Sequence, residues 1–137
     1  CTANKLKSLD ISNNLALTFL SCFNNNISHL DISKHTSLSY LDCSMNPIKA
    51  LDVSENANLA FLKCRKNKLE NLDVSNNPNL KTLYCSDNNI NILDLSNNSQ
   101  LIKLGCANNK LTSLDLTNNK LVKYPYVKGN LFDEPIR

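Results

Sequence analysis

The chain has 137 residues, a formal net charge of +3 and a sequence pI near 8.5. This charge is too small to indicate a nucleic-acid-binding protein by itself, so we expect no nucleic-acid partner. No apolar run is long enough to cross a bilayer, so we expect no membrane insertion.

Cysteine recurs at a fixed interval of 21 residues. The six cysteines are Cys1, Cys22, Cys43, Cys64, Cys85 and Cys106. A fixed period of about 20 to 50 residues is typical of a solenoid, in which each unit contacts only its neighbours. The sequence therefore predicts one repeat domain over residues 1–137, with about six and a half turns.

Five apolar rows keep the same interval. In one turn they are occupied by Leu17, Leu20, Ile27, Leu30 and Ile32. Together with the cysteine, each turn offers six inward apolar positions. A single turn cannot bury them alone, but stacked turns can.

Residues 19–23 predict a strand, because positions 20 and 22 are apolar in every turn while their neighbours vary. Successive copies should pair in parallel, about 4.8 Å apart. The segment 51–54 and its equivalents also alternate. They predict a second short strand or an extended stretch in each turn.

Polar rows accompany the apolar ones. Asn25 and its equivalents follow each cysteine by three residues, and a second asparagine row, which includes Asn56, has His35 in one place. We expect structural roles for both rows, because they repeat with little variation. The chain has two glycines, so asparagine should supply the left-handed corners. We expect His29 and His35 to be solvated.

The repeating unit reads L-x-x-L-x-C-x-x-N-x-[IL]-x-x-L-D-[VIL]-S-x-N-x-x. It resembles the leucine-rich repeat signature L-x-x-L-x-L-x-x-N/C-x-L, which is filled here by Leu17, Leu20, Cys22, Asn25 and Ile27. The match recurs in five full turns, and the short turns are similar to those of internalin-like bacterial surface proteins. The resemblance implies a mainly β, right-handed solenoid, with a parallel β-sheet on one face and short extended segments opposite.

The two ends depart from the regular pattern. Cys1 stands in register with Cys22, so the chain opens in the middle of a repeat. We favour a fragment of a longer chain over a lipid-anchored cysteine. Residues 122–137 predict an altered closing turn, because Pro125 and Pro135 replace row leucines and proline suits sheet edges.

The cysteines are expected to be buried, reduced and slow to react. Equivalent β-carbons on adjacent strands should lie about 4.8 Å apart, beyond the usual distance of about 3.5–4.5 Å for a disulfide. A straight row of thiols also does not converge on a metal. We therefore expect no metal and no cofactor.

The row of six aspartates has two interpretations. Each carboxylate can accept a backbone amide at the following corner, or the row can bind a cation such as calcium. We favour the first. The two histidines do not repeat and no catalytic constellation can be assembled, so we expect no enzyme.

The variable positions beside each cysteine should form the ligand-binding face. Seven of the eight aromatic residues lie there. The residues of this candidate face are Phe19, Phe23, Tyr40, Phe61, Lys63, Arg65, Tyr84, Tyr124 and Tyr126. Exposed aromatic groups are typical of binding hot spots. Cross-strand stacking that only stabilises the sheet is the alternative.

Three finer features are expected on this face. Phe19, Tyr40 and Phe61 should form an apolar strip. The missing side chain of Gly105 should leave a notch between Tyr84 and Tyr126. A basic cluster beside the strip consists of Lys63, Arg65, Lys66 and Lys68.

Three functions remain open. The resemblance favours a protein-binding module of a bacterial cell-surface or secreted protein. A glycan-binding module would use Tyr84 and Tyr126 as platforms for sugar rings. A structural spacer would have no ligand. Oligomeric state is left open.

Overall fold

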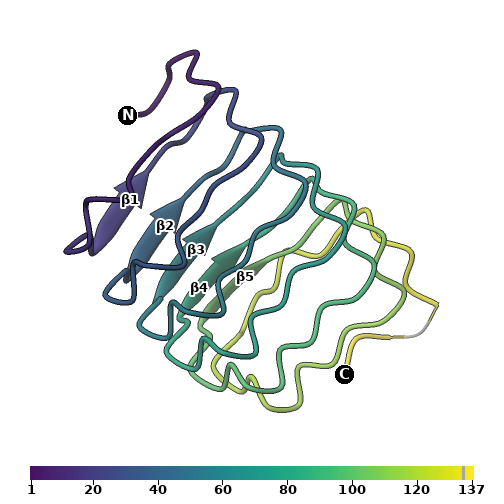
Figure 1. Ribbon diagram of the computed structural model, residues 1–137. Coiled ribbons are helices and arrows are strands. Elements are labelled where there is room, and N and C mark those ends of the chain that lie inside the picture. The colour runs from purple at the N-terminus through teal and green to yellow at the C-terminus, as the bar shows by residue number, and fades with distance from the viewer. Residues whose placement is uncertain (134) are drawn as a thin grey trace.

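The computed structural model of the protein describes residues 1–133 and 135–137 and is a stack of similar turns (Figure 1). Five short strands form a single parallel sheet in chain order, along one side of the stack. The strands are β1 (Phe19–Ser21), β2 (Tyr40–Asp42), β3 (Phe61–Lys63), β4 (Thr82–Tyr84) and β5 (Lys103–Gly105). No helix occurs among the described residues.

The strand register confirms the 21-residue repeat. Leu20 pairs with Leu41, and each later strand keeps the same offset. Beyond β5 the sheet is reduced to one bridge between Gly105 and Tyr126. Pro125 precedes that bridge and has no amide hydrogen to donate, which limits further pairing. The regular sheet therefore extends over five turns, fewer than the six and a half turns predicted for the whole stack.

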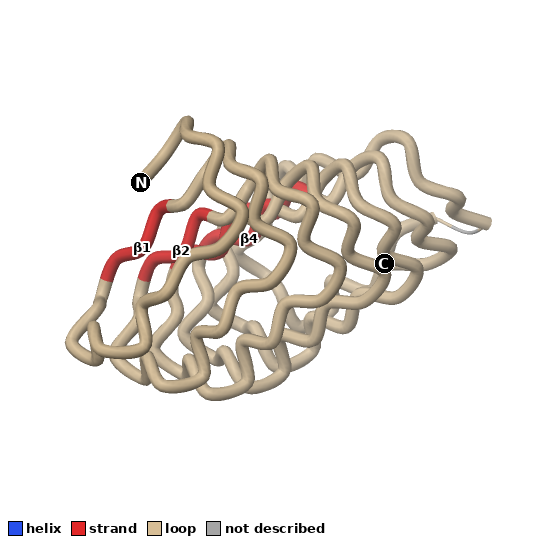
Figure 2. Tube along the Cα trace, turned by 45° about the horizontal axis from the view of Figure 1, so that its top comes forward, coloured by secondary structure: helices blue, strands red, loops and turns tan. Residues whose placement is uncertain are grey.

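The side opposite the sheet consists of tight turns. In each repeat two consecutive tight turns share one residue, which is asparagine everywhere except at His35. The backbone amide of Asn56 donates to the carbonyl of Val53 (3.1 Å), and the backbone amide of Leu59 donates to that of Asn56 (2.9 Å). Figure 2 shows this side entirely as loop. Of the two sequence alternatives for the segment 51–54, a second strand does not form in the described chain.

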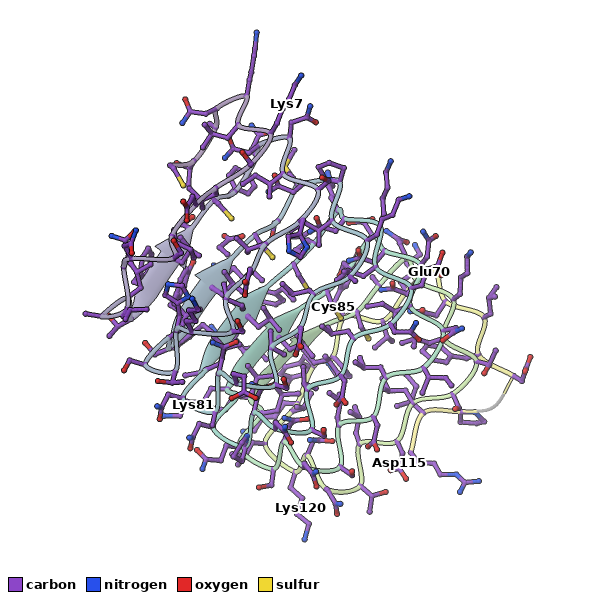
Figure 3. The ribbon with its side chains drawn as sticks, viewed as in Figure 1. Lys7, Glu70, Lys81, Cys85, Asp115 and Lys120 are labelled. Atoms are coloured by element: carbon purple, nitrogen blue, oxygen red, sulfur yellow. The ribbon has the colours of Figure 1, made fainter. Side chains whose placement is uncertain are left out.

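The core lies between these two sides. It contains leucine, isoleucine, valine and cysteine side chains, and those of the middle turns are at most 7% exposed. Cys85 lies inside the stack, whereas Lys81, Asp115 and Lys120 lie at its periphery (Figure 3). Leu6 and Val127, in the terminal turns, are only partly buried, because a neighbouring turn covers them on one side only.

The asparagines that follow the cysteines link adjacent turns. The side-chain amide of Asn88 donates to the carbonyls of Cys64 (2.9 Å) and Cys85 (3.0 Å), and its oxygen accepts the Leu69 amide (3.1 Å). The same arrangement recurs along the row from Asn25 to Asn130. The predicted structural role of this row is confirmed.

The second asparagine row links turns on the opposite side. The side-chain amide of Asn98 donates to the backbone carbonyls of Val74 and Asn77, both at 3.0 Å. His35 takes the same place in an earlier turn: it is buried, and its Nε2 lies 3.1 Å from the carbonyl oxygen of Ile11. The expectation that His35 is solvated was therefore wrong, whereas His29 is exposed as predicted.

The left-handed corners do not depend on the asparagine rows. They fall one residue before each asparagine of the first row, where the chain has Ala3, Asn24, Met45, Lys66, Asp87, Asn108 and Gly129. Only two of these residues are asparagine, so that expectation was largely wrong. The stacked hydrogen bonds on both sides of the corner impose the conformation whatever the side chain.

Replacing a buried asparagine of the first row should be costly. Asn88→Ala leaves the Leu69 amide without its partner inside the stack and removes one of two asparagine donors from each of the carbonyls of Cys64 and Cys85. We expect a loss of roughly 2–4 kcal/mol in the free energy of unfolding. Urea unfolding followed by circular dichroism measures the loss. Asn89→Ala is the matched control, since Asn89 is exposed, and should change stability by less than about 0.5 kcal/mol. Equal losses for both variants would contradict the role of the row.

Candidate functional site

The strand face carries a continuous aromatic strip. Phe19 and Tyr40 are register partners whose rings stack at a centroid separation of 4.2 Å and an interplanar angle of 10°. Tyr40 and Phe61 follow at 6.0 Å and 35°. The sheet places these rings side by side because parallel, in-register strands put equivalent side chains next to each other.

The strip is open to solvent. Phe19 is 59% exposed and Phe61 is 40% exposed, while Tyr40 between them is half-buried. Stacking therefore covers only part of the apolar area, and the rest is available to a partner. Phe132, the one aromatic residue outside the face, packs against the core.

The second aromatic group of the face lies over β4, β5 and the closing turn. Tyr124 and Tyr126 are exposed, and Tyr84 is half-buried. A β-carbon added to Gly105 would lie 2.8 Å from Cδ1 of Tyr84. The Tyr84 ring therefore already occupies the space that we expected as an empty notch. Beside it is a hollow of about 480 Å³, here called the tyrosine hollow, because Tyr84, Tyr124 and Tyr126 line it.

This tyrosine hollow also includes apolar side chains that the sequence did not indicate. Ile102 and Leu121 line it and are about half exposed. Neither belongs to a repeating row, and no single-residue signal distinguishes them from ordinary surface leucines and isoleucines. Their proximity to the tyrosines follows only from the stacking of turns.

A second hollow of the face, about 390 Å³, is basic. The hollow, here called the basic hollow, is lined by Phe23, Asp42, Ser44, Met45, Lys63, Arg65, Lys66 and Tyr84. The Nζ atom of Lys63 lies 5.4 Å from the centroid of the Tyr40 ring, so the basic cluster adjoins the aromatic strip. Asp42, Ser44 and Met45 were absent from the predicted set.

The cysteines do not form a reactive site. Cys22, Cys43, Cys64, Cys85 and Cys106 are free thiols and fully buried, and Cys1 is a free, exposed thiol. Burial raises the pKa of Cys22 to about 11 and that of Cys106 to about 12. It also raises the pKa values of the three thiols between them. The thiolate, which is the nucleophile and metal ligand, is therefore disfavoured.

The aspartate row satisfies its own corners. The Oδ1 atom of Asp52 accepts the Ser54 amide at 2.9 Å, and the same bond occurs in every turn. These bonds hold the pKa of each carboxyl below its usual value. Among the described residues, no three acidic, cysteine or histidine side chains converge as a metal site would require.

Comparison with solved structures identifies the fold. The functional domain of InlJ from Listeria monocytogenes, described as including a cysteine ladder, aligns over 98% of this chain at 35% identity with a TM-score of 0.75. The chain is an internalin-like leucine-rich repeat protein. Comparisons with protein-family models and with curated proteins give no match.

Two other structures share this leucine-rich repeat fold. An internalin, InlF, from Listeria monocytogenes aligns over 90% of the chain at 23% identity with a TM-score of 0.79. A leucine-rich repeat protein of Leptospira interrogans aligns over 93% at 23% identity with a TM-score of 0.69. The aligned regions make up 35%, 39% and 42% of the solved chains of InlJ, InlF and the Leptospira protein.

No helix capable of crossing a membrane was found in the part of the chain that the structure describes.

The thiols of this internalin-like repeat should differ sharply in reactivity. At pH 8 we expect one thiol, Cys1, to react rapidly with a disulfide reagent in the folded protein, because it alone is exposed. The five buried thiols should react only on unfolding. Labelling followed by mass spectrometry of peptides measures this. Rapid labelling of two or more buried thiols without denaturant would contradict the burial.

Because of the aspartate row, the free energy of unfolding should decrease as the pH falls. The carboxyl pKa of Asp73 is lower in the folded chain than in the unfolded one, mainly through the Ser75 amide. Its stabilising effect is therefore present above the unfolded pKa of about 3.9 and is lost as the pH falls. Asp73→Asn keeps an oxygen acceptor but cannot titrate. Urea titrations from about pH 5 to pH 2 should show that acid lowers the free energy of unfolding less in this variant than in the unmodified chain. The same pH profile for both proteins would contradict the assignment.

Proposed function

We propose that the chain is a non-catalytic protein-binding module of a bacterial cell-surface or secreted protein. It binds through its aromatic strand face. The main support is the aromatic strip of Phe19, Tyr40 and Phe61, which is continuous across three strands and exposed at both ends. Aromatic side chains are enriched among residues that dominate binding energy, and an exposed group of them is costly unless a partner covers it.

The comparisons support the location and the class of the module. The aligned proteins come from Listeria monocytogenes and Leptospira interrogans, and two of them are internalins. A leucine-rich repeat scaffold suits protein recognition, because its conserved rows build the stack while the positions between them vary. The chain spans about a third of the solved functional domain of InlJ, so the partner and the role of the whole protein are proposed from the face alone.

Glycan binding is the second candidate, and a specific observation favours it. The tyrosine hollow brings Tyr84, Tyr124 and Tyr126 together around a space of about 480 Å³. Aromatic rings offer flat apolar surfaces with a polar tip, which suit sugar rings. Protein binding remains preferred, because the aromatic strip lies on β1, β2 and β3 and none of its three residues lines this hollow.

Alanine at Phe19, Tyr40 and Phe61 should reduce binding to a protein partner at least about 30-fold, the effect of losing roughly 2 kcal/mol of hot-spot energy. Proteins from cell-surface extracts are first captured on the immobilised chain, and the affinity of each captured protein is then measured by interferometry. The variant Leu15→Ala with Ile92→Ala is the matched control, since both side chains are exposed and lie outside the strand face.

The result separates the three functions. Loss in the aromatic variant alone supports protein binding through the strip. Binding on a glycan array that requires Tyr84 and Tyr126 but not the strip would favour the glycan module instead. No specific binding of any surface protein or glycan would favour a structural spacer without a ligand. Unchanged binding in every variant would contradict binding through the aromatic face and indicate that the aromatic residues only stabilise the sheet.

A further inference from the structure

Charge is segregated between the two sides of the stack. The strand side is defined here as the nine residues that begin one position before each strand, together with residues 123–131. Nine of the fifteen lysines and arginines lie on it: Lys63, Arg65, Lys66, Lys68, Lys81, Lys103, Lys110, Lys123 and Lys128. Only two carboxylates, Asp42 and Asp87, share that side. The net charge of +3 therefore conceals a strongly basic face, which attracts acidic partners.

The charge is densest at the basic hollow. Lys63, Arg65 and Lys66 all come from the turn that contains β3. Phe23 and Tyr84 lie at its two ends, from the turns of β1 and β4. The hollow thus combines three cations with an aromatic group at either end.

The cations have no acidic partner among residues 1–133 and 135–137. Asp42 is the one carboxylate that lines the hollow, and its Oδ1 accepts the Ser44 amide at 3.1 Å. None of the three cations forms an ion pair with any described residue. Their charges therefore remain available to a ligand, and neighbouring like charges favour an anionic one.

The backbone beneath these cations is fixed. The Arg65 amide donates to Oγ of Ser44 at 3.1 Å, and the Lys66 amide donates to the carbonyl of Ser86 at 3.0 Å. Lys66 holds a left-handed conformation, with φ of 52°. The backbone atoms from which these side chains extend are thus held in place before a ligand binds, which lowers the entropic cost of binding.

We propose that the basic hollow binds an acidic segment of the protein partner, in which carboxylates flank an apolar side chain. The carboxylates pair with Lys63, Arg65 and Lys66, and the apolar side chain packs between Phe23 and Met45 on one side and Tyr84 on the other. This inference rests on the proposed protein-binding function and specifies the chemistry of the partner.

The dimensions and chemistry favour a peptide segment. Three turns separate Phe23 from Tyr84, roughly 14 Å at about 4.8 Å per strand, which an extended peptide spans with about four or five residues. The Arg65 guanidinium matches a carboxylate through two parallel hydrogen bonds. Methionine adapts its shape to apolar side chains, which a sulfated polysaccharide does not provide.

The test uses a random peptide library displayed on phage and selected on the immobilised chain. We expect the selected peptides to combine aspartate or glutamate with an aromatic or large aliphatic residue. Their affinity should fall about tenfold or more in the charge-reversal variant Lys63→Glu, Arg65→Glu, Lys66→Glu. It should also weaken as salt rises from about 50 to about 500 mM, because salt screens exposed charges.

Two variants control for folding and for net charge. Lys63→Gln, Arg65→Gln, Lys66→Gln removes the cations without introducing repulsion, and its circular dichroism verifies the fold. The variant Lys34→Glu, Lys49→Glu, Lys120→Glu changes net charge as much as the first reversal, at exposed positions outside the strand side. It should retain most of the peptide affinity.

The contrary outcomes are distinct. Peptides that need Phe19, Tyr40 and Phe61 but show no acidic bias would overturn this inference and leave the proposed function standing. A library in which no peptide depends on the hollow would overturn the inference alone, because the proposed function is tested on folded surface proteins. Binding of dextran sulfate that requires the three cations, without acidic peptides, would identify an anionic polysaccharide site instead.

Discussion

Buried asparagine side chains that bond to the backbone of the neighbouring turn hold this stack together. The side chain of Asn88 bonds to the carbonyls of Cys64 and Cys85 and to the amide of Leu69, so one side chain links three backbone groups in two turns. A turn of 21 residues without helix or long strand leaves many such groups unpaired, and burying them unpaired would be costly. The regular position of the asparagines is therefore a requirement of the backbone, and the apolar rows can stack only when it is met.

This requirement separates positions that build the stack from positions that are free to vary. The rows of leucine, cysteine and asparagine are largely buried, whereas the first and third residues of β1 and β3 are exposed or half-buried. The left-handed corner shows how strongly the backbone is constrained, since Met45 and Lys66 adopt it as Asn24 and Gly129 do. Side-chain identity at such a corner is thus available for recognition, and both Met45 and Lys66 line the basic hollow.

The same repetition gives the molecule its two unlike sides. Each aspartate of the row bonds to its own corner, which fixes the carboxylates away from the sheet in every turn. Nine lysines and arginines accumulate on the strand side, against two acids. Because the internalin-like fold repeats one geometry, a bias in residue choice at a single position becomes a continuous face. The aromatic strip and the basic hollow arise in this way and adjoin at Lys63 and Tyr40.

The sequence by itself determined the period, the strand register, the inward rows and the membership of the aromatic face. The reason is that side chains alternate along a strand and that a constant offset of 21 residues leaves one way to stack the turns. Only the tertiary structure decided which outward residues enclose a hollow, that Tyr84 covers Gly105, and that His35 is buried in the place of an asparagine. Those features depend on side-chain directions across two or three turns. A linear pattern specifies which residues are neighbours, whereas packing of their side chains decides where space remains between them.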